Sequence, residues 1–597
     1  MQGPRLLQCG YGPGDFSLGV GTPDPSLKIT VLNKPVKRQP VQVFPHSIGV
    51  FGPDGKPLHL RFYPEVTGPD TQIASCIKRF ACVSKPRDAT TVADFTRYAK
   101  AFIEAHFTPP THRPSLEEWL RNGSYPGPRR RQLSELHNKM LDISDKIVFC
   151  DSFIKGNEGF AEAKQARSIN ALSDQIKVLY GPLFAAIDAS TFGAHGGKWS
   201  VKHTDPAALP KRLQELFGDS RVLETDFSSM EAHHRGPFIE VIRHWALHMS
   251  RNFQKDEPRA YFRLLSRIML GTNICRYSHV KVELAETLMS GASWTSSSNY
   301  VLNLLIMSYI YYRTKFPRGD APNCLSPEEL AKMAIDFKGI FEGDDGMSEA
   351  TNMNTELVEK LGLRLKFEEF ENFRDASFCG NNMSPDGVIM KDPKKVMSSL
   401  FGVPRQFAGA KESTKINYVV EKAKSMYHMY KNCPVVGPMS YEILRQHGFR
   451  DTRKVEKHLT TWEREQREFH SRSKRLDKPE ISHASRLQVE KKFFMNIDRQ
   501  TCFERAFAHK CQVTGSLDLL TPEESELRDH YIITKAEFDA GLLPPLTPHP
   551  EVTKIIDRAK VNGGVGLEPT DKGKPHSITK RERRARPWLR NSEWSSF

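Results

Sequence analysis

The pattern of hydrophobic and polar residues changes several times along the chain. Residues 1 to about 60 hold short apolar pieces between Pro- and Gly-rich stretches such as "GYGPGDF" and "FGPDGKP", which predicts extended arms and turns. Helical spacing begins near residue 90, in "VADFTRYAKAFIEAHF" and "RRRQLSELHNKMLDI". Mixed helix and strand patterns then run to about residue 400. Beyond that point "NYVVEKAKSMYHMYKN" and "TRKVEKHLTTWEREQREFHSRSKRL" predict helices again.

The most apolar stretch is "NYVLNLLIMSYIYY", from Asn299 to Tyr312. It has the length of a buried helix and falls short of the ~20 apolar residues that a membrane span needs. The first residues, "MQGPRLLQCGYGPGDFSLG", also lack the apolar region of a signal peptide. We therefore expect a core helix, in a protein that is soluble or reaches membranes through another molecule.

Composition adds a charge argument. The 597 residues include 86 Lys and Arg against 71 Asp and Glu, which gives a net charge of +15. Such a surface suits an acidic polymer, although a membrane-surface protein or a viral coat would also be basic. The ten cysteines are scattered without a C-x-x-C pair, so the pattern does not predict zinc, and reduced intracellular thiols are expected.

Two adjacent carboxylates stand out in "IFEGDDGM", residues Ile340 to Met347. Asp344 and Asp345 follow an apolar run and are bracketed by glycines, a composition typical of a tight hairpin turn. The same pair at a hairpin tip could hold hard cations through oxygen. Taken alone, the motif favours the plain turn.

A second acidic position lies upstream in "RVLETDFSSMEAHHRG". Val222 and Leu223 predict a strand that would deliver Asp226 at its end. A pair of catalytic ions needs carboxylates from at least two elements, and Asp226 is a candidate for the second one. The alternative is a helix cap made by Asp226 or Ser228.

Between these acidic positions lies "LMSGASWTSSSNYVLNLL". Ser290 and Gly291 begin a flexible loop, while Thr295 and Asn299 are four residues apart and share one helix face. Hydroxyl and amide groups at this spacing could hydrogen-bond a ribose 2′-hydroxyl. Ordinary capping of a Ser-rich helix N-terminus is the alternative.

These three stretches resemble, in order and spacing, motifs A, B and C of RNA-dependent RNA polymerases from positive-strand RNA viruses of the tombusvirus-like and flavivirus-like group. The resemblance extends more loosely to "FIKGNEGFAEAKQARSINALSD", which looks like the basic motif F, with Lys155, Lys164 and Arg167 at its cationic positions. "ELVEKLGLRLKF" looks like motif D, a helix followed by a strand that carries Lys366, and "SFCG" looks like the motif E turn. The similarity covers roughly residues 150 to 385.

The resemblance implies an α+β fold, a closed right hand with an antiparallel palm sheet and a mostly helical thumb. The expected division is an N-terminal extension with fingertip arms over 1–90, fingers over 91–218 with part of 236–283, a palm over 219–380, a thumb over 381–540 and a basic tail over 541–597. In that tail, basic residues interleaved with Trp588 and Trp594 could bind RNA, but a solubility tail or a localisation signal fits equally well.

The same resemblance implies two Mg²⁺ or Mn²⁺ ions, held by Asp226 and Asp344 with Asp345 beside them. One ion would activate an RNA 3′-hydroxyl, and the other would neutralise the triphosphate and the leaving pyrophosphate. Lys366 is the candidate general acid for that pyrophosphate.

For nucleotide binding, the resemblance implies a triphosphate grip by the motif F cations Lys155, Lys164 and Arg167. Sugar selection falls to Ser290, Gly291, Thr295 and Asn299 together with Glu231, which stands where Asp is usual. Our hypothesis is that Glu231 contacts the ribose. A bond from Glu231 to Asn299 or to a motif F cation is the alternative.

The expected activity is therefore RNA-directed RNA synthesis from NTPs on an RNA template, with no DNA. We expect it in the host cytoplasm within a viral replication complex, with other viral proteins or host membranes as further partners. Three rivals remain open. They are a reverse transcriptase, a non-catalytic basic protein that packages RNA, and an unrelated Mg²⁺-dependent nuclease.

Overall fold

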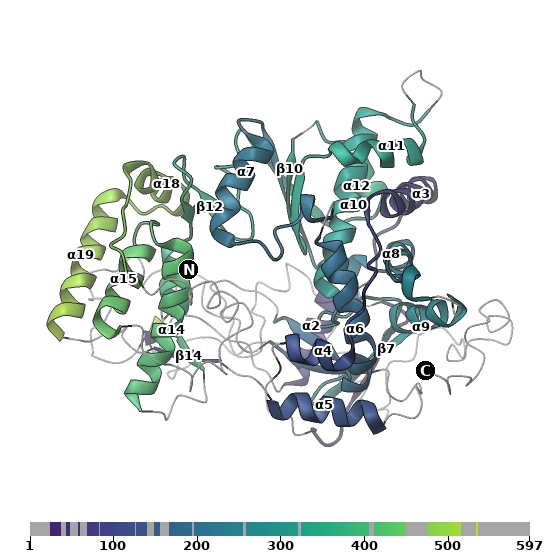
Figure 1. The fold of residues 1–597 in the computed structure, drawn as a ribbon, viewed down its shortest axis with the longest axis horizontal. Helices are drawn as coiled ribbons and strands as arrows, with labels where there is room; N and C mark the ends of the chain where they lie inside the picture. The colour runs from purple at the N-terminus through teal and green to yellow at the C-terminus, as the bar shows by residue number, and fades with distance from the viewer. Residues whose placement is uncertain are drawn as a thin grey trace.

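The structure is a computed structural model of the chain (Figure 1). Helices and strands gather into two groups, one of them built from the C-terminal helices that Figure 1 draws at the left. The structure describes residues 24–36, 43–47, 58–59, 68–82, 84–123, 125, 127–139, 149–155, 166–193, 196–254, 258–319, 324–350, 352–400, 402–404, 411–448, 475–514 and 533–534.

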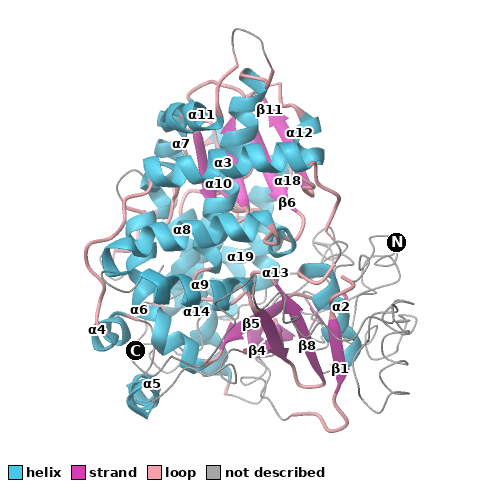
Figure 2. Cartoon of the chain, turned by 90° about the vertical axis from the view of Figure 1, so that its right-hand side faces the viewer, coloured by secondary structure: helices cyan, strands magenta, loops and turns pink. Residues whose placement is uncertain are grey.

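A five-stranded sheet collects strands from distant parts of the chain (Figure 2). Its neighbours are antiparallel, except that β4 and β7 run parallel. In order across the sheet the strands are β1 (Lys28–Val31), β8 (Val280–Ala285), β7 (Thr272–Arg276), β4 (Cys150–Ile154) and β5 (Ser168–Leu172).

A second, four-stranded antiparallel sheet lies between two hydrophobic cores. Successive side chains of a strand point to opposite faces, so Val222 enters one core while Leu223 enters the other. The same alternation separates Ile340 from Phe341. The strands, in spatial order, are β11 (Leu365–Phe370), β6 (Val222–Phe227), β10 (Asp345–Glu349) and β9 (Gly339–Glu342).

The larger core surrounds helix α10 (Thr295–Lys315). Every residue of this helix from Ser297 to Arg313 is buried, as expected for a helix that is apolar around most of its circumference. The prediction of a core helix at Asn299–Tyr312 is confirmed.

Shorter helices cover α10 and the two sheets. The α-helices are α2 (Pro69–Arg79), α3 (Ala89–His106), α4 (Leu116–Asn122), α5 (Gly127–Lys139), α6 (Asp174–Thr191), α7 (Leu209–Phe217), α8 (Pro237–Gln254), α9 (Pro258–Leu270), α11 (Pro327–Met333) and α12 (Thr355–Lys360). The 3-10 helices are η2 (Gly196–Trp199), η3 (Pro206–Ala208), η4 (Met230–His233) and η5 (Ala334–Asp336).

C-terminal helices complete the second core against the outer face of the four-stranded sheet. They are α13 (Pro393–Leu400), α14 (Glu412–Tyr430), α15 (Val436–His447), α18 (His483–Phe493) and α19 (Ile497–Thr514). Three two-stranded pairs join β12 (Asn382–Met383) to β13 (Ile389–Met390), β14 (Gly402–Pro404) to β2 (Val43–Ser47), and β15 (Ile533–Thr534) to β3 (Leu58–His59).

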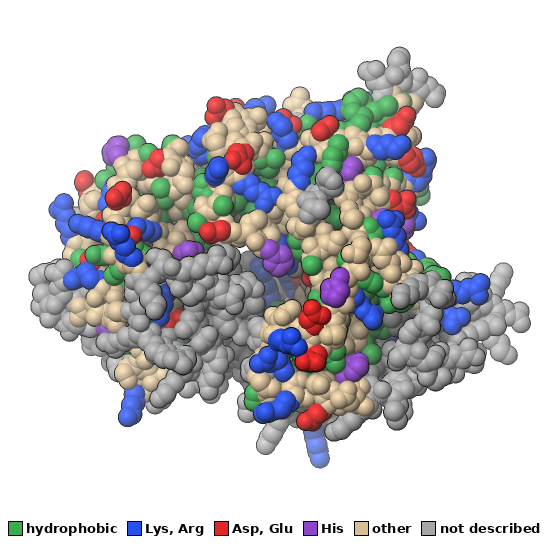
Figure 3. All heavy atoms as spheres, in the orientation of Figure 1, with side chains coloured by type: hydrophobic (Ala, Val, Ile, Leu, Met, Phe, Trp, Pro, Cys, Tyr) green, Lys and Arg blue, Asp and Glu red, His purple; other side chains and the backbone are tan. Residues whose placement is uncertain are grey.

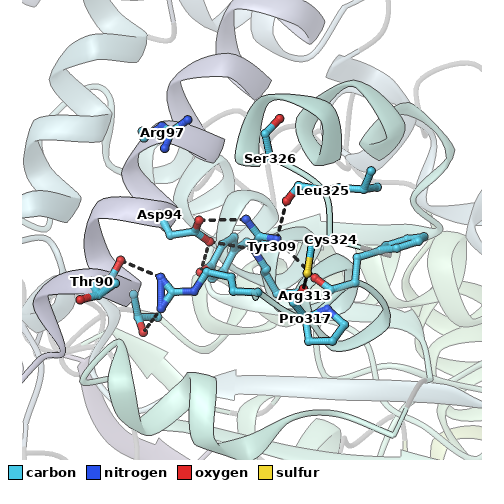
Figure 4. A network of polar contacts seen from close by, with 12 residues as sticks. Thr90, Asp94, Arg97, Tyr309, Arg313, Pro317, Cys324, Leu325 and Ser326 are labelled. Atoms are coloured by element: carbon cyan, nitrogen blue, oxygen red, sulfur yellow. Dashed lines mark hydrogen bonds and ion pairs between the residues drawn. The ribbon is translucent and has the colours of Figure 1, made fainter. Parts of the chain in front are cut away.

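A buried ion pair fixes the C-terminal end of α10 to α3 (Figure 4). Arg313 Nη2 and Nε donate to the two carboxylate oxygens of Asp94 at 2.8 and 2.7 Å, and the Tyr309 hydroxyl donates to Asp94 Oδ2 at 2.8 Å. Arg313 Nη1 also donates to the carbonyl of Leu325, at 2.8 Å. This two-pronged geometry offsets the cost of taking both charges out of water.

The fold class predicted from the sequence, a mixed α+β protein, is confirmed. Helices predicted near residue 90 and in "NYVVEKAKSMYHMYKN" correspond to α3 and α14. Most of the helix predicted in "TRKVEKHLTTWEREQREFHSRSKRL" and the whole basic tail lie outside the described residues. Among the described helices, none combines the length and the apolar character needed to cross a bilayer.

On the face seen in Figure 3, Lys and Arg side chains are spread among acidic ones over many elements. The described part of this face therefore gathers no single basic patch that would by itself point to an acidic polymer.

Replacing Arg313 by Met should lower the free energy of unfolding by about 3–5 kcal/mol, because it leaves the Asp94 carboxylate buried without its counterion. Urea denaturation followed by tryptophan fluorescence measures the change.

The matched control is Arg97→Met. The pair that Arg97 forms with Glu328 joins the same helix α3 to α11, but both side chains are largely exposed, at 62% and 44%. Its loss should cost less than about 1 kcal/mol. Equal losses in the two variants would contradict the role given to the buried pair.

Candidate functional site

The acidic motif forms the tip of the hairpin between β9 and β10. Gly343 and Asp344 make the turn, and Asp345 is the first residue of β10. Gly343 has a φ of +61°, a conformation that costs glycine little and other residues more. The prediction of a tight turn is confirmed.

Asp226 lies next to this hairpin, at the end of β6. Thr225 faces Gly346 across the two strands, so the next position brings Asp226 beside Asp345. On the other side of β6, Lys366 of β11 is the direct cross-strand neighbour of Asp226. Residues opposite each other share one face of a sheet, so Asp226, Asp345 and Lys366 gather on the face toward the second core.

Burial and like charge act together on Asp345. They raise its pKa to about 6, burial contributing most and the carboxylates of Asp344 and Asp226 adding to it. The thiol of Cys379 donates a hydrogen bond to the Asp345 carboxylate and opposes this rise. Burial also raises the pKa of Glu224, two residues before Asp226 on the same face, although its carboxylate accepts a 2.7 Å bond from the Ser377 N–H.

The second glycine of the motif has a different role from the first. Gly346 lies within β10, and a Cβ built there would come within 2.5 Å of Thr225 Oγ1 and 2.8 Å of the Phe341 ring. The sequence reading assigned both glycines to turning the backbone. Only Gly343 does so, because Gly346 instead lets β10 and β6 pack closely.

Asn303 of α10 holds the acidic turn from behind. Its amide Nδ2 lies 3.1 to 3.3 Å from the carbonyl oxygens of Gly343, Asp344 and Asp345. The sequence reading missed this residue. The available signal was an Asn inside an apolar run, four positions after Asn299 and therefore on the same face of the helix.

The donor chemistry of the acidic site suits a hard cation such as Mg²⁺. Even so, within the described ranges no three or more His, Cys, Asp or Glu side chains converge closely enough to hold a metal ion. The carboxylates of Asp344 and Asp226 both act on Asp345, but the three side chains do not surround a single point. Mg²⁺ is commonly bound by one or two carboxylates, with water and substrate phosphates filling the other positions. The residues therefore fit an ion that arrives with a phosphate-bearing substrate.

The loop that precedes α10 packs against β5. The Ser290 carbonyl accepts the Asn170 N–H at 2.5 Å, and Ser290 Oγ donates to the Ser168 carbonyl at 2.9 Å. Gly291, with a φ of +112°, lies so close that an added Cβ would come within 3.1 Å of the β5 backbone. The Thr295 hydroxyl closes the loop by bonding the carbonyl of Met289 at 2.8 Å.

Two of the predicted phosphate-binding cations lie at the neighbouring ends of β4 and β5. The Lys155 N–H donates to the carbonyl of Arg167 at 2.8 Å, which places these two residues opposite each other. Because β5 also carries the contact with Ser290, both cations are near the loop before α10. Lys164, the third predicted cation, lies outside the described residues.

Glu231 and Asn299 are both buried, and each is held by a residue that the sequence reading did not assign to the site. Glu231 Oε1 pairs with Arg79 Nη2 of helix α2 at 3.1 Å. Asn299 Oδ1 accepts a bond from His234 Nε2 at 2.9 Å. Glu231 therefore pairs with Arg79 in the described contacts, and because Lys164 lies outside the described residues, the alternative of a bond from Glu231 to Asn299 or to a motif F cation stays a prediction.

The adjacent histidines are neutral and adopt opposite tautomers. His233 Nε2 accepts the Arg364 N–H at 2.8 Å, so its proton is on Nδ1, whereas His234 donates from Nε2. Burial lowers the pKa of His233 to about 4 and that of His234 to about 3. No spacing in the sequence points to these contacts.

Comparison with known proteins adds no further constraint. The chain matches no family model, and it matches no curated protein sequence.

Asp345→Asn should stabilise the metal-free protein at pH 8 by on the order of 1–2 kcal/mol, because it removes a carboxylate whose charge the fold disfavours. The folded pKa of Asp345, about 6, lies above its ordinary value of 3.8, so ionisation of Asp345 destabilises the fold at high pH. This destabilisation is relieved as the pH falls from 6 to 4, and the difference between the variant and the wild type should shrink with it. Thermal unfolding in a chelator at pH 8 and at pH 4 measures this.

A control is Glu117→Gln, which alters an exposed carboxylate on α4 and should change the melting temperature little at either pH value, because an exposed ion pair contributes little to stability. A destabilised Asp345→Asn at pH 8 would contradict the electrostatic account.

Asn303→Leu should lower the free energy of unfolding by about 1–3 kcal/mol, since three turn carbonyls lose their buried donor. Amide hydrogen exchange over residues 339–349 should also become faster. Ser308→Ala is the control, because Ser308 is a buried polar residue of the same helix whose partners are Leu304 and Tyr98. Unchanged exchange in the hairpin of Asn303→Leu would refute its role there.

Proposed function

We propose that the chain is an RNA-directed RNA polymerase, which replicates a viral positive-strand RNA genome by adding nucleotides from NTPs to an RNA 3′ end. The observation that carries this proposal is that Asp226, at the end of β6, lies beside Asp345, at the start of β10, on the two central strands of an antiparallel sheet. Asp344 stands in the adjoining turn and Lys366 on the next strand. In this proposal the four-stranded sheet is the palm, the elements around β4 and β5 belong to the fingers, and α13 to α19 form the thumb.

Asp226 and Asp344 would hold the two Mg²⁺ or Mn²⁺ ions, with Asp345 as a neighbour whose pKa makes it sensitive to their charge. The ions supply activation of the 3′-hydroxyl and neutralisation of the triphosphate. Lys366, exposed beside Asp226, would stand where the leaving pyrophosphate needs a proton. Lys155 and Arg167 would meet the incoming phosphates, since their strand ends adjoin the loop before α10.

The test is primer extension by the full chain on a short RNA template, with NTPs and Mg²⁺ or Mn²⁺. Asp344→Ala should reduce extension by about a hundredfold or more, because several kcal/mol of charge stabilisation would be lost. The matched control is Asp219→Ala, which removes a 91% exposed acid just before the same strand β6 and should extend RNA at the wild-type rate.

Three outcomes would overturn the proposal. The first is a wild-type chain that makes no product over a range of templates and with both metals. The second is an Asp344→Ala variant that extends RNA as well as the wild type does. The third is a wild-type chain that makes DNA from dNTPs in preference to RNA. RNA binding that needs no metal, without synthesis, would favour a packaging protein instead.

A further inference from the structure

Helix α2 reaches the candidate nucleotide site from the N-terminal part of the chain. Gln72 Nε2 donates to Ser278 Oγ at 2.7 Å, and the Cys76 thiol donates to the Tyr277 hydroxyl at 3.2 Å. These bonds fix α2 beside the turn between β7 and β8, so its last residue, Arg79, is delivered by a firmly attached helix.

The ion pair between Arg79 and Glu231 leaves one carboxylate oxygen unused. Glu231 is only 6% exposed, and its Oε1 pairs with Arg79 Nη2 at 3.1 Å. Its Oε2 is buried and has no hydrogen-bond partner among the described residues. Leaving a buried charged acceptor unsatisfied is costly unless a donor arrives from elsewhere. A sugar hydroxyl is a donor of the required kind.

Asn299 is oriented in a comparable way by His234. Its Oδ1 is occupied by His234 Nε2–H, which turns the amide so that its Nδ2 donors are directed away from the histidine. The Thr287 hydroxyl lies 3.4 Å from the Glu231 carbonyl and ties the backbone of Glu231 to the segment after β8. An acceptor and a donor are thus each held by one outer partner.

We propose that Arg79 and His234 are positioning residues for Glu231 and Asn299, so that helix α2 takes part in the choice of ribonucleotides over deoxyribonucleotides. This inference rests on the proposed polymerase function. Arg79 holds Oε1 so that Oε2 accepts the 2′-hydroxyl, and His234 holds the amide so that Nδ2 donates to the same group. Neither residue touches the substrate.

The test compares kcat/KM for ATP and dATP in single-nucleotide extension of an RNA primer. Arg79→Met should reduce the ATP preference by about tenfold, mainly by raising KM for ATP, because a site built to bond a hydroxyl loses its discrimination when its polar groups move. Arg79→Lys, which keeps the charge, should restore part of the preference. In a Glu231→Gln background, Arg79→Met should have little further effect on the ratio.

Arg486→Met is the matched control for Arg79. Its pair with Glu504 is as buried as the pair between Arg79 and Glu231, with side-chain exposures of 15% and 13%, but it joins α18 to α19. It should leave the ATP to dATP ratio unchanged. To test the positioning of Asn299, His234→Phe is compared with His233→Phe. The His234 variant should lower the ATP to dATP ratio more, because His233 bonds the backbone of Arg364 and Ser229 and not Asn299.

The inference fails if Arg79→Met lowers kcat/KM for both nucleotides equally, or if His234→Phe changes the ratio no more than His233→Phe. A wild-type chain without any extension activity would instead overturn the proposed function. The two failures are therefore distinguishable.

Discussion

Burial of α10 is the constraint on which the rest of this structure depends. A polar group taken out of water must find a partner within the protein, because leaving it unpaired costs more than the bond itself contributes. Several buried polar residues of α10 therefore connect it to other elements. Asn299 connects to His234, Asn303 to the acidic turn, Ser308 to Tyr98, and Arg313 to Asp94. One helix thus sets the relative positions of η4, the hairpin and α3.

The four-stranded sheet brings acidic side chains close together on this framework. Its two faces enter different cores, and Asp226 and Asp345 lie side by side at the ends of its two central strands. Burial, with the nearby carboxylates of Asp344 and Asp226, raises the pKa of Asp345. A cation with its own phosphate ligands would relieve the repulsion without rearranging the backbone.

Local features of the sequence predicted the mixed α+β class and several elements that surround the candidate site. The turn at Gly343, the strand before Asp226 and the helix that begins at Thr295 depend on residue spacing within short stretches, and the structure has all three. Arg79, His234 and Asn303 escaped prediction for a physical reason. Arg79 lies 152 positions from Glu231, so no periodicity within one element could reveal their pairing. The prediction of a turn glycine is wrong for Gly346, because what excludes a side chain there is the lack of space beside Thr225. That restriction comes from the packing of neighbouring strands and not from a turn of the backbone.

The five-stranded sheet has a consequence for how the chain is made. Its edge strand β1 pairs with β8, and Lys28 lies opposite Glu283, more than 250 residues later. At ribosomal rates of about 5–20 residues per second, β1 waits roughly 10 to 50 seconds before its partner is synthesised. During this interval it is an unpaired strand edge, a state prone to association with other chains. Early folding of this protein therefore requires that β1 does not associate with other chains before β8 has been synthesised.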